Sequence, residues 1–261
     1  MNHWSTFPHS GAFDYNAQSL KKCWAQLHAG DGEPLPSDPR VLEAWVKFHN
    51  GEFEAARDEG LQAAAEGNEA GATVANKATC IYATYLEKKE KTRLDLFLEV
   101  AQRAESVTLL APRAINAWYL QAYALGRYSQ GISVAKALAQ GLGGKVKDSL
   151  EKTLALNPAH ADAHIALGTF HAEVIDKVGV LIGHMTYGAK KEIGLHHFGE
   201  ALKLKPNSAI ALMEYANALV MLEGEQGMEQ ATALYEKAAA CEPQDAMELL
   251  DIELARAELA N

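Results

Sequence analysis

The stretch Thr153-Leu-Ala-Leu-Asn-Pro158 decides the fold, because two later stretches end in almost the same way. These are Ala201-Leu-Lys-Leu-Lys-Pro206 and Ala238-Ala-Ala-Cys-Glu-Pro243. After each proline the pattern restarts with one or two polar residues and then an Ala-rich amphipathic segment. A pattern that restarts in this way predicts stacked helix-turn-helix units, each of which buries its apolar face against its neighbours.

The same pattern extends toward the N-terminus. A further unit opens at Pro112, and two earlier units are predicted over residues 71–112 and 39–67. The segment Asn50-Gly-Glu-Phe-Glu-Ala-Ala56 resembles the turn at the core of a tetratricopeptide repeat, with the small Ala56 allowing close helix approach. The sequence therefore predicts an all-α fold, a right-handed tetratricopeptide-like α-solenoid.

The predicted organisation has two parts. Residues 1–38 should form an N-terminal part, with a loose arm over residues 1–11 and a helix over residues 12–29. Residues 39–261 should form the repeat domain, closed by a C-terminal capping helix over residues 244–260.

Two insertions distinguish this chain from a regular repeat array. The intervals from Pro112 to Pro158 and from Pro158 to Pro206 are 46 and 48 residues, against about 34 in a standard unit. The excess falls between the two helices of each unit, near residues 129–143 and 177–190. Both insertions are apolar for loops, so we expect them to fold back as short helices that bury the large apolar side chains of the second insertion. These are Val178, Val180, Leu181, Ile182 and Met185. Such insertions either narrow an inner cavity or only fill the core.

Three segments carry a closer resemblance. They are the helix over residues 117–129, the stretch Met185-Thr-Tyr-Gly-Ala189 and the following helix over residues 197–202. Together they resemble the T component associated with TRAP-type transporters and the related regulators of microtubule dynamics. This resemblance covers roughly residues 70–245 and implies a tetratricopeptide-like fold and a small-molecule-binding component of a transport system.

Composition narrows the function classes. The formal net charge of −10 argues against a general nucleic-acid binder, which needs a basic surface. The three cysteines are far apart and lack metal-ligand spacing, so we expect reduced thiols and a cytoplasmic location. The N-terminus shows no secretory signal pattern, and no segment reaches the roughly 18 apolar residues of a membrane span.

Chemical motifs are sparse. His160 and His164 have the spacing of a helical metal pair, but Ala161 stands where a metalloprotease motif needs glutamate. The glycines of Gly141-Leu-Gly-Gly-Lys145 follow no predicted strand, so they are a poor phosphate-binding loop. We therefore expect no metal, no cofactor and no catalytic residues.

Binding residues are predicted from the position of each residue within its repeat. The positions of the first helix that face the concave groove of a tetratricopeptide unit are Asn116, Tyr119, Tyr123, Asp162, Ile165, Thr169, Ile210, Met213 and Asn217. Tyr119 and Tyr123 share one helical face and offer apolar area with polar tips. The predicted binding residues are Asn116, Tyr119, Tyr123, Arg127, Thr169, Tyr187, Met213 and Asn217.

The same count assigns other residues to the packed interior. They are Trp118, His164, His171, Phe198, Ala201, Leu212, Leu219, Tyr235 and Ala238. The leading interpretation is a non-enzymatic adaptor that binds a protein segment in its concave groove. The alternative is a small-molecule-binding component of a TRAP-type transport system, and an enzyme with a cavity site is the third class.

Overall fold

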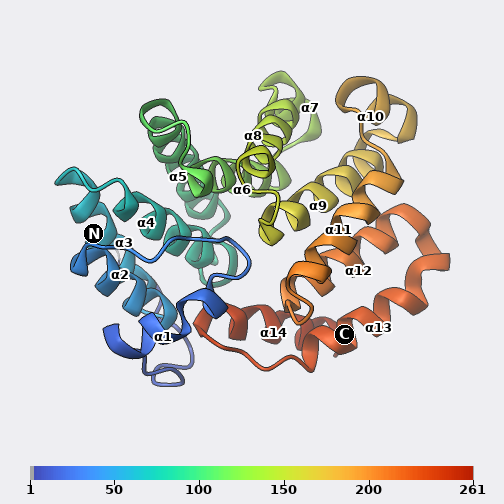
Figure 1. Ribbon diagram of the computed structural model, residues 1–261. Helices are drawn as coiled ribbons and strands as arrows, with labels where there is room; N and C mark the ends of the chain where they lie inside the picture. The colour runs from blue at the N-terminus through green and yellow to red at the C-terminus, as the bar shows by residue number, and fades with distance from the viewer. Residues whose placement is uncertain (1–2, 261) are drawn as a thin grey trace. The chain divides into compact units, whose positions relative to one another are not determined.

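The computed structural model describes residues 3–260, and every regular element within that range is helical (Figure 1). The all-α prediction is therefore confirmed. The chain forms two compact units. Unit 1 comprises the chain up to His28, Glu33–Leu156 and Asp245–Met247, and unit 2 comprises Ala29–Gly32, Asn157–Gln244 and the chain from Glu248 onward. The predicted boundary after residue 38 was drawn from the sequence pattern alone, and it stays a prediction.

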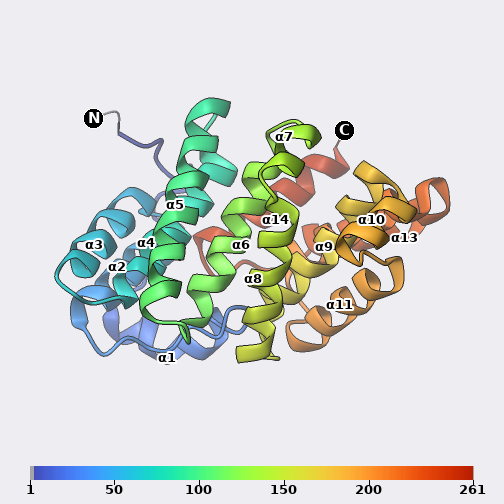
Figure 2. The same cartoon turned by 90° about the horizontal axis from the view of Figure 1, so that it is seen from above.

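Unit 1 is built from consecutive helices that pack on one another. Its helices are α1 (Ala17–Leu27), α2 (Pro39–His49), α3 (Phe53–Ala65), α4 (Ala70–Ile81) with the π-helical η1 (Tyr82–Leu86), α5 (Glu90–Leu110), α6 (Ile115–Gln130), α7 (Val134–Ala139) and α8 (Leu142–Leu156). The helices pack in sequence order, α2 on α3, α3 on α4, α4 on α5 and α5 on α6, and α6 packs on α8. Figure 2 shows α5, α6 and α8 side by side. This is the neighbour-to-neighbour packing of a helical solenoid.

Glycine allows the closest of these approaches. A Cβ on Gly60 of α3 would lie 2.6 Å from the carbonyl oxygen of Gly71 on α4. Ala56, one turn earlier on α3, is fully buried, as expected from the repeat core. The two helix backbones therefore touch where the sequence has its smallest residues.

The N-terminal arm is packed, and the expectation of a loose arm is wrong for its described part. Phe7 is 5% exposed and meets Phe53 edge to face, with ring centroids 6.1 Å apart. Trp4 stacks on Tyr82 at 4.1 Å, and the Arg57 guanidinium lies 4.0 Å from the Trp4 ring centroid. Large aromatic side chains bury enough area to order a short segment.

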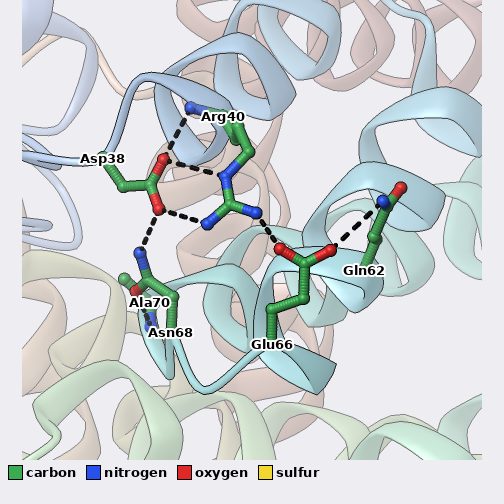
Figure 3. Close-up of polar contacts among 6 residues, drawn as sticks. All are labelled: Asp38, Arg40, Gln62, Glu66, Asn68 and Ala70. Carbon is green, nitrogen blue, oxygen red and sulfur yellow. Dashed lines mark hydrogen bonds and ion pairs between the residues drawn. The ribbon is translucent and has the colours of Figure 1, made fainter.

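A polar network ties the start of α2 to the turn between α3 and α4 (Figure 3). The Asp38 carboxylate caps α2 by accepting from the Arg40 backbone N–H at 2.8 Å. The Arg40 guanidinium contacts both Asp38 and Glu66, and Asn68 Nδ2 donates to Asp38 at 2.9 Å. The hydrogen bonds from Arg40 hold the pKa of Asp38 well below its usual range.

Unit 2 repeats the same packing. Its helices are α9 (Ala161–Val178), α10 (Val180–Tyr187), α11 (Lys191–Leu204), α12 (Ala209–Glu223) with the 3₁₀ helix η2 (Gly224–Gly227), α13 (Met228–Ala239) and most of α14 (Ala246–Leu259). Helix α9 packs on α11 and α12, and α12 packs on α13. Phe198 is fully buried, and a Cβ on Gly168 would lie 2.6 Å from the Phe198 ring. The same ring stacks on Tyr215 at 5.1 Å.

The insertions form the short helices α7 and α10, as expected, but the predicted burial of the second is wrong. Val180, Leu181, Ile182 and Met185 are 67%, 71%, 58% and 77% exposed. The reason is local: the buried residue of α10 is Gly183, where a Cβ would lie 3.1 Å from Val174 of α9. Because the residue facing α9 is a glycine, the large side chains of α10 point elsewhere.

Two predicted interior residues also differ. Trp118 is only half-buried, and its indole Nε1 donates to the Pro112 carbonyl at 3.0 Å. Tyr235 is half-buried, and its hydroxyl donates to Asn217 Oδ1 at 2.6 Å. In both cases the polar tip reaches a partner near the surface, which keeps part of the ring in water.

Candidate partner-binding site

Helix α6 carries four of the predicted binding residues, and three of them, Tyr119, Tyr123 and Arg127, follow one another on one face. The ring centroids of Tyr119 and Tyr123 lie 6.2 Å apart, with the ring planes tilted by 55°. The Arg127 guanidinium lies 5.4 Å from the centroid of the Tyr123 ring, within cation–π range. Because residues four apart share a helical face, the three side chains form one continuous line. We call this set the α6 line.

The α6 line becomes more accessible toward the C-terminal end of the helix. Tyr119 is 9% exposed, whereas Tyr123 and Arg127 are half-buried. The Tyr123 hydroxyl lies 2.9 Å from Thr84 Oγ1 on η1. Burial raises the pKa of Tyr123, so its phenol stays neutral at physiological pH. The line therefore offers aromatic area together with a hydroxyl and a guanidinium.

Two further cations, Lys77 and Arg103, act on the Cys80 thiol together with Arg127. Burial raises the pKa of the Cys80 thiol to about 12, and Arg103, Arg127 and Lys77 oppose that rise through their positive charges. Arg103 Nε donates to Asn76 Oδ1 at 2.7 Å, while its buried Nη2 atom has no hydrogen-bond partner. Sequence reasoning missed Lys77 and Arg103, because single basic residues within helices normally mark a solvated face.

Asn116 lies one turn before Tyr119 but faces inward. It is 6% exposed, and its Nδ2 donates to Glu33 Oε2 at 2.5 Å. Glu33 itself is 9% exposed and lies in the Pro-rich linker before α2. The structure thus places the Asn116 amide against the linker in unit 1.

The predicted residues of unit 2 occupy different environments. Thr169 is half-buried and donates to Glu214 Oε2 at 3.1 Å, and Asn217 accepts from Tyr235 as described above. Met213 is 2% exposed and belongs to the apolar core between α12, α13 and α14. Tyr187, at the end of α10, is half-buried and meets Phe170 edge to face at 6.2 Å.

A histidine cluster lies on α9 and α11, and as a group its members were considered from sequence only as a metal site. His164 Nδ1 lies 2.8 Å from His197 Nδ1, and the rings of His171 and His197 are nearly parallel at 6.3 Å. His164 Nε2 lies 3.1 Å from the Pro158 carbonyl, so it carries a proton, and Nδ1 of a neutral His164 must accept from His197. The signal was present in the helical spacing of His164 and His171 and in the pair His196-His197.

The histidine cluster does not have the arrangement of a metal site among the described residues. Within residues 3–260, no set of three His, Cys, Asp or Glu side chains is arranged to hold a metal ion. In the same range, no helix combines the length and the apolar character that crossing a bilayer requires.

Comparison with solved structures identifies the architecture. The chain is similar to a thermophilic TPR (tetratricopeptide-repeat) protein of Thermus thermophilus, with a TM-score of 0.57 and 14% identity. The match covers 84% of this chain and 97% of the other. The fold is that of a tetratricopeptide-repeat protein. No protein-family model and no curated protein matches the chain. The predicted tetratricopeptide-like solenoid is therefore confirmed at the level of fold, and the closer resemblance to the TRAP T-component group stays a prediction from sequence.

Proposed function

We propose that this tetratricopeptide fold is a non-enzymatic adaptor that binds a segment of a partner protein on a surface built around α6. The observation that carries the proposal is the α6 line, in which two tyrosine rings and a guanidinium follow one another at one-turn intervals. Helix pairs that stack in sequence order present successive helices side by side, which gives an extended surface suited to an extended segment.

The chemistry of the α6 line indicates what kind of segment it binds. Tyrosine supplies contact area at low entropic cost, and arginine pairs with carboxylates in a fixed geometry. Arg127 supplies this positive charge in a chain whose formal net charge is −10. We therefore expect the segment to place apolar side chains against the rings and an acidic group near Arg127.

The remaining predicted residues take two roles in the proposal. Thr169, Tyr187 and Asn217 are proposed to contact a partner from unit 2, because each is half-buried and has a hydroxyl or amide. Asn116 and Met213 are buried, so they are proposed to support the contacting helices from beneath.

The test uses peptides selected on the wild-type protein from a random-peptide display library. Tyr119→Ala/Tyr123→Ala should weaken binding of the selected peptides by about tenfold to a hundredfold, because the Tyr123 contact and the buried Tyr119 ring beside it are both lost. Trp118→Ala is the matched control, since Trp118 is a half-buried aromatic residue on the same helix outside the α6 line. Fluorescence polarisation gives the affinities and circular dichroism checks the fold. Equal affinity in a folded double variant would falsify the proposal.

The alternative of a small-molecule component rests on the sequence resemblance. Native mass spectrometry of protein purified from its own source separates the two functions. A bound small molecule that is lost in Tyr119→Ala/Tyr123→Ala, together with a failure to select peptides, favours the alternative. Peptide binding without such a mass favours the adaptor.

A further inference from the structure

The N-terminal arm, residues 3–11, docks on unit 1 through two aromatic side chains. Residues 3–7 form no helix or strand, so this part of the arm is held by its side chains and not by pairing with a regular element. Trp4 and Phe7, three positions apart, reach two separate contact points, on η1 and on α3. Anchoring side chains on an irregular segment are also the means by which folded domains recognise short peptides.

The first contact point combines a ring and a cation. The Trp4 indole stacks on the Tyr82 ring with centroids 4.1 Å apart and planes 6° from parallel. The Arg57 guanidinium lies 4.0 Å from the centroid of the same indole, within cation–π distance. The Ser5 N–H donates to the Tyr82 hydroxyl at 3.4 Å. Tryptophan makes the strongest cation–π contact of the aromatic side chains, so this point favours tryptophan.

The second contact point is a space left by a glycine. Phe7 is 5% exposed, and its ring meets Phe53 edge to face at 6.1 Å. A Cβ on Gly51 would overlap the Phe7 ring, so the turn before α3 leaves room for this ring only because it has glycine there. The space is closed on one side by the edge of an aromatic ring and therefore suits phenylalanine.

The arm is joined to unit 1 in a way that allows it to leave without disturbing the helices. Behind it, the Asn50 side chain accepts from the Tyr15 N–H at 2.8 Å and donates to the Tyr15 carbonyl at 2.9 Å. Gly11, between the arm and this anchor, has a positive φ and open space around its Cβ position. Chain ends open at a lower free-energy cost than the packed interior. Release of the arm therefore leaves the anchor at Tyr15 in place.

We propose that the surface formed by Gly51, Phe53, Arg57 and Tyr82 binds a segment of a partner protein with two aromatic side chains in Trp-x-x-Phe spacing. The arm competes for this surface from within the same chain. A tethered competitor acts at an effective concentration in the millimolar range, so the arm excludes weak partners. This surface lies on α3 and η1 and does not include the α6 line. The proposal therefore stands or falls independently of the proposed peptide binding at α6.

The probe is a fluorescein-labelled peptide with the sequence of residues 3–9, His-Trp-Ser-Thr-Phe-Pro-His. Trp4→Ala/Phe7→Ala in the full chain undocks the arm, and it should bind the probe at least about tenfold more tightly than the wild type does, because the competitor is lost. A probe with alanine at both aromatic positions should not bind. Adding Arg57→Ala to the double variant should weaken binding by about threefold through loss of the cation–π contact. Fluorescence polarisation gives the affinities, and circular dichroism checks the fold.

The matched control is Thr6→Ala/Ser10→Ala, since both residues are exposed positions of the arm. It should bind the probe as weakly as the wild type. Trp4→Ala alone provides a second variant, because Trp4 is half-buried and its loss leaves Phe7 and the interior intact, and it should also gain affinity for the probe.

Three results overturn the proposal. One is an unchanged affinity in the folded Trp4→Ala variants, and another is equal binding of the alanine-substituted probe. The third is a wild-type dimer that Trp4→Ala/Phe7→Ala abolishes, because it would assign the surface to the arm of a second copy of the chain.

Discussion

His49 Nδ1 and Asp245 Oδ2 lie 2.7 Å apart, although 196 residues separate them in the chain. Both side chains are 2% exposed. His49 ends α2 and Asp245 directly precedes α14, so the imidazole lies at a helix C-terminus and the carboxylate at a helix N-terminus. His49 Nε2 also lies 3.3 Å from Nε2 of the buried His28, which extends the polar group into the core of unit 1.

Removing one member of this pair should strongly destabilise unit 1. We expect Asp245→Ala to lower the free energy of unfolding by about 3–5 kcal/mol, because it leaves His49 buried without its carboxylate. Urea denaturation followed by circular dichroism measures the change. Asp58→Ala is the control, since the Asp58 side chain is 60% exposed and its ion pair lies at the surface. A loss below about 1 kcal/mol for Asp245→Ala would show that the pair is not a structural tie.

Two glycines of unit 2 should respond to alanine in opposite directions. A Cβ on Gly168 would lie 2.6 Å from the Phe198 ring, whereas Gly199 has nothing within 4 Å. We expect Gly168→Ala to destabilise by about 1–3 kcal/mol through overpacking. Gly199→Ala, within α11, should stabilise by up to about 1 kcal/mol through helix propensity. Thermal unfolding of both variants checks the prediction, and a shift of the same sign in both would contradict the close packing of α9 on α11.

The repeat pattern predicted the parts of the fold that depend on local periodicity. The interior positions of Phe198 and Ala201 followed from counting along each unit, because the same positions pack in every tetratricopeptide repeat. The outward face of α10 did not follow from that count. It depends on Gly183, and sequence shows that a segment is apolar without showing which residue faces its neighbour.

The candidate site was less predictable for a similar reason. The spacing of Tyr119 and Tyr123 on one helical face was readable, since residues four apart are neighbours on any helix. The contacts of His49 with Asp245 and of Asn116 with Glu33 join segments 196 and 83 residues apart. No local pattern in a single sequence specifies such pairs, so the buried amide of Asn116 could not be distinguished from an exposed one.

The histidine cluster should make stability depend on pH. Burial, and then the charges of His164, His171 and His196, lower the pKa of His197 from 6.5 to about 4. Between these values the unfolded chain binds a proton that the folded chain does not, so the free energy of unfolding falls as pH falls from about 6.5 to about 4. The full difference corresponds to about 3 kcal/mol, which partial exposure of His197 reduces to about 1–2 kcal/mol.

The contribution of His197 is measured by urea denaturation at a series of pH values. His197→Gln should flatten the dependence between pH 6.5 and pH 4, since the titrating group is absent. His184→Gln is the control in the same unit, because His184 is exposed, and it should keep the wild-type slope. An unchanged slope in His197→Gln would assign the pH dependence to other groups.

The three cysteines should differ in reactivity toward alkylating reagents. Cys80 is 1% exposed, and burial raises its pKa to about 12, so it has almost no reactive thiolate near neutral pH. Cys23 and Cys241 are half-buried and therefore reachable. We expect iodoacetamide to modify Cys23 and Cys241 in the native protein and Cys80 only after unfolding, as followed by peptide mass spectrometry. Because Cys80 is buried on α4, its modification in urea should track the global unfolding transition. Modification of Cys80 in native buffer at a rate similar to that of Cys23 would mean that the structure around α4 opens locally without unfolding of unit 1.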